Sequence, residues 1–206
     1  MTFATQLTLT RADVAQFRLT DEYSIHRVIY SLFDDVRDES KKAESQSSGF
    51  VYAPLTQNVL THQYLIISNR KPRIPANFQG QMVVKEIPDR FFDATMYRFK
   101  VIINPTKRNA QTQKLEGIRD KRAILGWFAQ RGEQWGIAFE TELMLERLTV
   151  DVFKGKDNNK ITVAKAEISG VLRVTDRERF KLAVTQGVGR SRAFGCGLFQ
   201  VLPIFD

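Results

Sequence analysis

The sequence predicts an α+β fold built from two tandem ferredoxin-like units, each with the order strand, helix, two strands, a variable element and a strand. Two observations predict it. Strand-like and helix-like patterns recur in this order in both halves of the chain. The length of 206 residues also fits two domains of roughly 100 residues each. Such a unit places its helices on one face of an antiparallel sheet and leaves the other face open.

The first unit begins with the alternation of a strand at residues 3–10. Asp21 then opens a helical pattern. Aromatic and apolar residues recur in it at spacings of three and four, namely Tyr23, His26, Ile29, Tyr30 and Phe33. The stretch 34–48 is charged and rich in serine, with little apolar content, and it indicates a loop.

The rest of the first unit reads as strands. Three strand-like runs follow the loop, at residues 50–55, 64–68 and 81–87. Pro72 and Pro75 argue against a regular helix between the last two runs, because proline lacks the amide that a helix interior needs. We therefore expect an N-terminal ferredoxin-like domain over residues 1–90 that carries the Tyr23/His26 helix.

The second unit repeats the order and predicts a C-terminal ferredoxin-like domain over residues 95–206. Its expected strands lie at 97–103, 136–139, 143–153, 160–174 and 197–203. Its expected helices lie at about 118–131 and from Asp176 to Ala183, and residues 155–159 form a turn.

Composition excludes several classes of protein. One cysteine permits no intramolecular disulfide, and one cysteine with two histidines cannot build a Cys/His zinc site, so we expect no metal. The first residues lack the basic start and apolar run of a signal peptide. No stretch approaches the ~20 apolar residues that span a bilayer. These features favour a cytoplasmic protein with no membrane partner.

The net charge of +8 is concentrated in the second half of the chain. Residues 98–131 carry nine basic side chains against two acidic ones, and residues 154–206 carry ten against five. Clustered positive charge is typical of a surface that binds phosphate. A basic surface that serves only solubility is the alternative interpretation.

The most distinctive segment holds four glycines and two arginines between Gly187 and Gly197. Glycine permits positive φ, so successive amides can point at an anion, and Arg190 and Arg192 would add charge there. Gly187-Val-Gly189 is not a dinucleotide fingerprint, because a helix precedes it and a strand follows. We therefore expect no cofactor. A tight helix-to-strand turn with incidental arginines is the alternative.

This segment resembles a known family. Gly187-Val-Gly-Arg-Ser-Arg-Ala-Phe-Gly-Cys-Gly-Leu198 is similar to the glycine-rich signature of the CRISPR precursor-RNA endoribonucleases, within the RAMP superfamily, and looks most like the CasE group of type I-E systems. Three further segments resemble the family in the same order along the chain. They are the Tyr-x-x-His helix at 21–33, the strand ending in Asn-Pro-x-Lys at 97–107, and residues 168–176.

The resemblance implies an architecture of two ferredoxin-like domains, in agreement with the pattern above. It also implies cleavage of CRISPR repeat RNA at the base of a hairpin, leaving 2′,3′-cyclic phosphate or 3′-phosphate ends. The enzyme would remain on its product crRNA and join the other subunits of a type I surveillance complex. When free, it would be a monomer.

The resemblance assigns catalysis to Tyr23 and His26. Attack by the 2′-hydroxyl of RNA needs a proton removed, a proton delivered to the leaving oxygen, and charge relieved on the phosphorane, and it needs no metal. Histidine can move either proton because an imidazole has an unperturbed pKa of about 6.5. His26 would be the general acid or base, and Tyr23 would orient the 2′-hydroxyl or phosphate. From spacing alone, a helix histidine packed among Ile25, Ile29 and Phe33 is the simpler interpretation.

The family often adds a cation that stabilises the transition state. Lys154, Lys156 and Lys160 flank one turn here, and Lys160 is our choice. Cys196 is expected to be a buried small residue, because no paired base is evident for a nucleophile.

RNA affinity is expected from the backbone and the shape of the hairpin, since A-form RNA hides its base edges. The expected RNA-binding residues are Arg98, Lys100, Lys107, Arg108, Lys114, Arg119, Arg190 and Arg192 with Gly187 and Gly189, together with the helix cations Lys121 and Arg122. The main alternative is a non-catalytic RNA-binding subunit of a ribonucleoprotein, which needs no Tyr/His pair. A small-molecule enzyme is the third interpretation.

Overall fold

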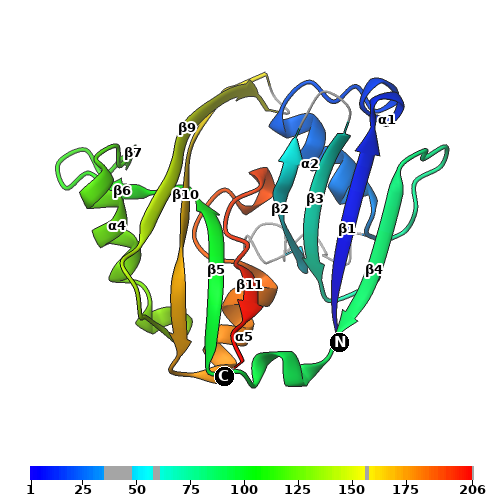
Figure 1. Ribbon diagram of the computed structural model, residues 1–206. Helices are drawn as coiled ribbons and strands as arrows, with labels where there is room; N and C mark the ends of the chain where they lie inside the picture. The colour runs from blue at the N-terminus through cyan, green and yellow to red at the C-terminus, as the bar shows by residue number, and fades with distance from the viewer. Residues whose placement is uncertain (35–47, 58–60, 156–157, 206) are drawn as a thin grey trace.

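The computed structural model describes residues 1–34, 48–57, 61–155 and 158–205. Two antiparallel sheets follow one another along the chain, one from strands within residues 2–87 and the other from strands within residues 96–203 (Figure 1). The α+β class and the two tandem ferredoxin-like units predicted from the sequence are confirmed. The limits of the two domains, 1–90 and 95–206, stay a prediction.

The first sheet has the strand order β2-β3-β1-β4. Its strands are β1 (Thr2–Thr10), β2 (Phe50–Gln57), β3 (Thr61–Ser68) and β4 (Gln81–Ile87). Helix α2 (Glu22–Ser31) covers one face, where Ile25 and Ile29 pack on Leu7, Tyr52 and Ile66 of the strands. Buried side chains alternate along β1 with more exposed ones, so this strand turns one face to the core.

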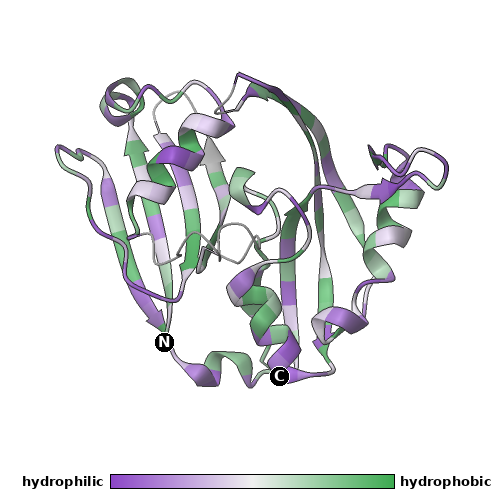
Figure 2. Cartoon of the chain, turned by 180° about the vertical axis from the view of Figure 1, so that it is seen from behind, coloured by the Kyte–Doolittle hydropathy of each residue, from purple (hydrophilic) through white to green (hydrophobic). Residues whose placement is uncertain are grey.

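The second sheet has the order β11-β5-β10-β8, and β9 pairs with the free part of β10. Its strands are β5 (Met96–Ile103), β8 (Ile137–Phe139), β9 (Met144–Lys154), β10 (Lys160–Val174) and β11 (Gln200–Pro203). Helices α4 (Lys121–Ala129) and α5 (Arg177–Gln186) cover one face, where Phe128 and Phe180 join the buried row Tyr97, Phe99 and Val101 of β5. Figure 2 shows the helices from this side.

Most predicted elements lie within a few residues of their observed limits. Helix α2 begins after the expected cap Asp21, and α5 begins after Asp176 but runs three residues past Ala183. Residues 70–80 form no regular helix, as the two prolines predicted. The final strand is shorter than expected and begins at Gln200. Residues 35–47 of the expected loop lie outside the described residues.

A short helix and a small hairpin were among the elements not predicted. Helix α1 (Arg11–Gln16) follows β1 directly and is fixed by a reciprocal capping box between Thr10 and Asp13. The basic stretch before α4 contains a small hairpin, β6 (Thr106–Arg108) and β7 (Leu115–Gly117). Its turn is ordered by the side chain of Asn109, which accepts hydrogen bonds from the amides of Gln111 and Thr112.

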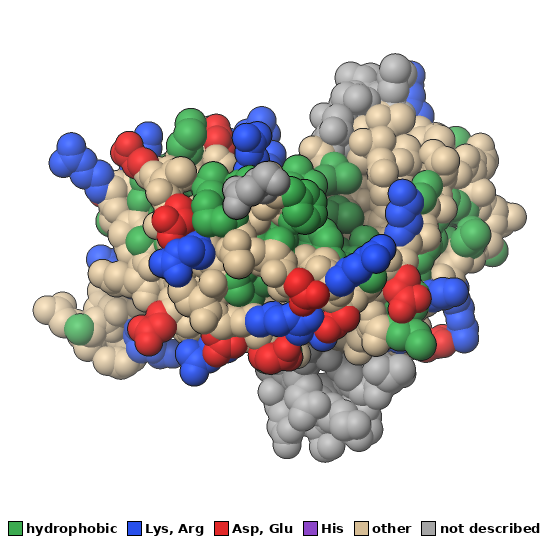
Figure 3. Space-filling model, turned by 60° about the horizontal axis from the view of Figure 1, so that its bottom comes forward, with side chains coloured by type: hydrophobic (Ala, Val, Ile, Leu, Met, Phe, Trp, Pro, Cys, Tyr) green, Lys and Arg blue, Asp and Glu red, His purple; other side chains and the backbone are tan. Residues whose placement is uncertain are grey.

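The two halves pack on one another along the glycine-rich segment. Leu198 is buried against Val51, Ala53 and Ile67 of the first sheet. At the lower end, Arg177 and Lys181 of α5 bind Asp89 of the connecting segment, with distances of 2.6 and 2.5 Å. Figure 3 shows acidic and basic side chains side by side across this end of the molecule. The glycine-rich segment is therefore held between the halves.

Candidate active site and RNA interface

Helix α2 presents Tyr23 and His26 at the boundary of the two halves. Asp21 and Ser24 form a reciprocal capping box, which satisfies amides of the first turn. Ile25 and Ile29 bury the opposite face in the first core. Because residues 23 and 26 are one turn apart, they share the remaining face, and both side chains are half-buried.

The imidazole of His26 lies among aromatic rings from both halves. Its ring centroid is 4.2 Å from that of Tyr30, 6.2 Å from that of Tyr23 and 5.8 Å from that of Phe194. Phe194 belongs to the glycine-rich segment. His26 thus faces that segment and is not enclosed in the core beneath α2, where Ile25, Ile29 and Phe33 lie.

The glycines predicted to need positive φ have it. Gly187, Gly189, Gly195 and Gly197 have φ between +71° and +88°. A Cβ on Gly197 would lie 2.3 Å from the carbonyl oxygen of Val188, so only glycine fits there. The amide of Val188 donates to the carbonyl of Gly197, and the amide of Gly197 donates to that of Ile102, which closes the segment into a turn fixed to β5. We name residues 187–197 the glycine turn.

Three side chains hold the glycine turn in place. The hydroxyl of buried Tyr52, in the first half, donates to the carbonyl of Ala193 at 2.7 Å. The amide of Asn104 donates to the hydroxyl of Ser191 at 2.7 Å. Arg192 donates to the carbonyl of Gln186 at the end of α5. Sequence patterns did not reveal the roles of Tyr52 and Asn104, because their partners lie far along the chain.

Some amides of the glycine turn serve the protein itself. The amides of Phe194 and Cys196 donate to the carbonyl of Ser191. The amides of Val188 and Gly197 donate to the carbonyls of Gly197 and Ile102. These four amides are therefore not directed at an anion, although the sequence suggested that successive amides of this segment could be. The positive charge of the turn comes from its two arginines, of which Arg190 is exposed.

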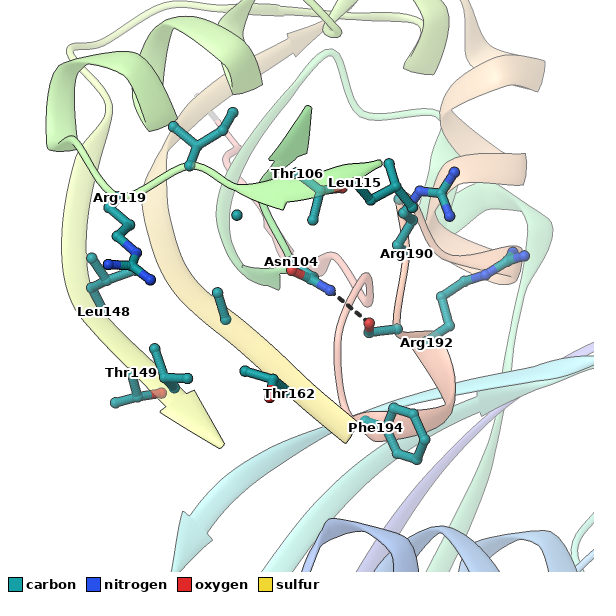
Figure 4. Close-up of a pocket in the computed structure, with 16 residues that line it drawn as sticks. Asn104, Thr106, Leu115, Arg119, Leu148, Thr149, Thr162, Arg190, Arg192 and Phe194 are labelled. Carbon is teal, nitrogen blue, oxygen red and sulfur yellow. Dashed lines mark hydrogen bonds between the residues drawn. The ribbon is translucent and has the colours of Figure 1, made fainter. Parts of the chain in front are cut away.

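A pocket of about 1210 Å³ opens beside the glycine turn. Arg119 lies on one side of it and Arg190 and Arg192 on the other (Figure 4). Leu148 and Val150 of β9 give it an apolar wall. Phe194 lines this pocket and also contacts the ring of His26, so one aromatic side chain lies between the arginine-lined pocket and the candidate catalytic histidine.

The β6–β7 hairpin extends the basic surface from this pocket. Thr106 and Leu115 of the hairpin line the pocket, and the expected RNA-binding residues Lys107, Arg108 and Lys114 lie on the same hairpin or its turn, all exposed. Arg119 follows it directly. Six of the predicted cations therefore lie in or next to the pocket, although Lys107, which alternates with Thr106 along β6, points to the other face of the hairpin.

The remaining strand cations lie on the other face of the second sheet. Along β5, Tyr97, Phe99 and Val101 turn to the helix-covered core, so Arg98 and Lys100 turn to the open face. Lys100 forms an ion pair with Glu167 at 2.6 Å. The structure does not bring Arg98 and Lys100 together with the pocket arginines.

The β9–β10 hairpin brings its lysines next to α2. Ile161 and Phe153 pack in one cluster with Tyr23 and Phe194, and the Phe153 and Phe194 rings are 4.9 Å apart. Lys160 and its cross-strand partner Lys154 are exposed beside this cluster. Lys160 is two residues before Thr162 on β10, so its side chain is on the same face of the strand as Thr162, which lines the basic pocket. Lys156 lies outside the described residues.

Cys196 is buried within the same cluster, as expected for a small apolar residue. Burial raises the pKa of its thiol to about 12, so the thiolate that a nucleophile needs is suppressed. Among the described residues, no group of three or more His, Cys, Asp or Glu side chains could hold a metal ion. None of the described helices has the length and apolar content of a bilayer span.

Comparisons with known proteins agree with this geometry. A model of the family described as CRISPR associated protein matches residues 2–203. The CRISPR-associated endoribonuclease Cse3 of Thermus thermophilus is 28% identical over 156 residues, covering 71% of this chain and 67% of that protein.

Two solved structures are similar in fold. Thermus thermophilus Cse3, bound to an RNA representing a pre-cleavage complex, matches with a TM-score of 0.78 at 22% identity, over 98% of this chain and 99% of that chain. A chain of a CRISPR RNA-guided surveillance complex in a pre-nicking state matches with a TM-score of 0.70 at 22% identity, over 98% of this chain and 100% of that chain. Because the family model spans almost the whole sequence, the resemblance first drawn from the glycine turn and the Tyr-x-x-His helix is confirmed, and this chain belongs to the CRISPR-associated protein family.

Proposed function

We propose that this protein is a metal-independent endoribonuclease that cleaves CRISPR repeat precursor RNA at a hairpin. The observation that carries the proposal is Phe194, which lines the arginine-bearing pocket and contacts the ring of His26. The surface that would hold phosphate is therefore one aromatic side chain away from an imidazole. The endoribonuclease activity of the Thermus thermophilus relative supports the same reaction here.

The chemistry would use the 2′-hydroxyl of the RNA as nucleophile. The oxygen attacks the adjacent phosphorus, the bond to the 5′-oxygen of the next nucleotide breaks, and a 2′,3′-cyclic phosphate remains. His26 would move one of the two protons as general base or general acid. The hydroxyl of Tyr23 would orient the 2′-hydroxyl or the phosphate. Lys160 would stabilise the charge that develops on the phosphorane.

The RNA would be held by its backbone. The β6–β7 hairpin and the pocket arginines lie next to each other, and their cations suit the phosphates of a hairpin stem. The exposed apolar side chains of Leu148 and Val150 cannot bind a phosphate. They would instead contact an unstacked base or a ribose near the cleavage site.

A cleavage assay in EDTA tests this function. A repeat hairpin should be cut by the wild-type chain in the presence of chelator and should yield a cyclic phosphate end. The same hairpin with a single 2′-deoxyribose at the cleavage position should bind equally well and stay intact. Tight binding of the normal hairpin without any cleavage would instead support the non-catalytic RNA-binding subunit. Cleavage that needs added Mg²⁺ would overturn the proposed chemistry.

The product complex would join other subunits of a surveillance complex. The fold is similar to that of a chain within such an assembly, which supports this partner class. We expect the free protein to be a monomer in the cytoplasm and to keep the cleaved crRNA bound. Light scattering before and after addition of the hairpin measures whether the protein is a monomer. A chase with unlabelled hairpin measures whether the cleaved crRNA stays bound.

A further inference from the structure

A buried lysine links the two halves beneath the candidate active site. The ammonium of Lys165, on β10, lies 3.0 Å from a carboxylate oxygen of Glu22 on α2 and 2.8 Å from one of Asp151 on β9. Its side chain is only 9% exposed. Lysine is almost never buried unless it is paired, so this cluster is a specific feature of the interface.

The charges of the cluster depend on one another. Burial disfavours the charged form of Lys165, but Glu22 and Asp151 more than offset this and raise its pKa. Burial raises the pKa of Glu22, and Lys165 opposes that rise. One cation thus separates two carboxylates. Without it, α2 and β9 would present like charges to each other and would tend to move apart.

The cluster is not needed to form the helix. The capping box of Asp21 and Ser24 begins α2, and Ile25 and Ile29 anchor it to its own sheet. Lys165 instead fixes the position of the first turn of α2 relative to the β9–β10 hairpin. Glu22 directly precedes Tyr23, and His26 lies one turn further on the same helix.

We propose that Lys165 is a positioning residue for RNA cleavage, which bridges Glu22 and Asp151 and thereby sets Tyr23 and His26 against the hairpin that carries Lys160. This inference rests on the proposed function. Because its ammonium is held by Glu22 and Asp151 and its side chain is only 9% exposed, Lys165 acts through α2 and not by direct contact with the RNA. It therefore affects the rate of the chemical step more than the affinity for RNA.

The test compares single-turnover cleavage at saturating enzyme with RNA affinity. Lys165→Met should slow cleavage by about 10- to 100-fold, as small misplacements of catalytic groups do, while the Kd for the hairpin changes little. Lys165→Arg should recover most of the rate, because a pocket of about 480 Å³ beside the cluster has room for a guanidinium. Arg173→Met is the matched control, because Arg173 lies on the same strand as Lys165 but forms an exposed ion pair with Glu140. This variant should cleave at the wild-type rate.

A neutral variant separates positioning from folding. The triple variant Glu22→Gln, Asp151→Asn and Lys165→Met has no charges in the cluster, so the two side chains at 22 and 151 no longer repel each other. It therefore remains informative even if Lys165→Met alone is unfolded. Slow cleavage by this folded variant supports a bridging role. Normal cleavage by Lys165→Met, or by the folded neutral variant, would overturn the inference while leaving the nuclease assignment intact. A wild-type chain that never cleaves would instead remove the proposed function.

Discussion

The ring centroids of His26 and Phe194 lie 5.8 Å apart, although one residue lies on helix α2 near the start of the chain and the other in the glycine turn near its end. Phe194 also lines the pocket that carries Arg119, Arg190 and Arg192. This contact joins the two parts of the proposed nuclease site, a group that can move protons and a surface that can hold phosphate.

The face that carries Arg119 and Arg190 should dominate RNA affinity. Each neutralised phosphate contributes about −0.7 to −0.9 to the slope of log K against log salt, so Arg119→Ala with Arg190→Ala should reduce the slope by about 1.5. Arg98→Ala with Lys100→Ala should have a smaller effect, because Lys100 already pairs with Glu167 on the other face. Salt titrations of hairpin binding check this. A larger effect of the second pair would place the RNA on the open face of the sheet.

The glycine turn should tolerate a side chain at one position and not at another. Gly197→Ala adds a Cβ 2.3 Å from a backbone oxygen at a φ of +88°, and Gly189→Ala adds one in open space at a φ of +71°. The left-handed backbone alone costs about 1–2 kcal/mol, and a clash adds roughly 1–3 kcal/mol. Thermal unfolding should therefore show a larger loss for Gly197→Ala. Equal losses at the two positions would mean that the turn relaxes freely.

Asp89 should stabilise the connection between the halves in a pH-dependent way. Hydrogen bonds from Lys181 and then Arg177 lower the pKa of Asp89 from 3.8 to about 2. A carboxyl with a lowered folded-state pKa contributes stability that is present above its unfolded pKa and is lost as pH falls through the folded one. The stability difference between wild type and Asp89→Asn should be constant at neutral pH and shrink between about pH 4 and pH 2. A difference that does not vary with pH in denaturant titrations would exclude this role.

Lys160 should matter to the rate more than its cross-strand partner Lys154. Both are exposed on the hairpin beside Tyr23, so each is a suitable control for the other. If Lys160 stabilises the phosphorane, Lys160→Ala should lower the single-turnover rate by about 10²-fold, with little change in Kd. Lys154→Ala should weaken binding slightly and leave the rate within a few fold. A reversed order would transfer the role to Lys154.

The strands and the larger helices were predictable because their signals are local. The alternation along β1 and the cap Asp21 are visible in the sequence, and so are the prolines that interrupt residues 70–80. Helix α1 was missed because its Thr10-x-x-Asp13 box precedes only six helical residues. The β6–β7 hairpin was not predicted, since each of its strands has only three residues.

The site itself was predictable only in part. The resemblance supplied Tyr23, His26 and the glycine turn, whose positive φ values followed from its glycines. The contacts that join these parts depend on the packing of the two halves, which no local pattern encodes. Lys165 is the clearest case, because a basic residue in a long strand reads as solvated, whereas here it is buried between two carboxylates.

The most direct test of the account is the cleavage rate of His26→Ala at saturating enzyme, measured together with its affinity for the hairpin. Loss of one proton-transfer group should slow cleavage by about 10²- to 10⁴-fold, while the arginine-lined surface keeps the Kd close to that of wild type. The remaining rate should also lose the pH dependence that the imidazole gives the wild-type enzyme. Cleavage by His26→Ala at the wild-type rate, with binding intact, would contradict the account and remove His26 from the reaction.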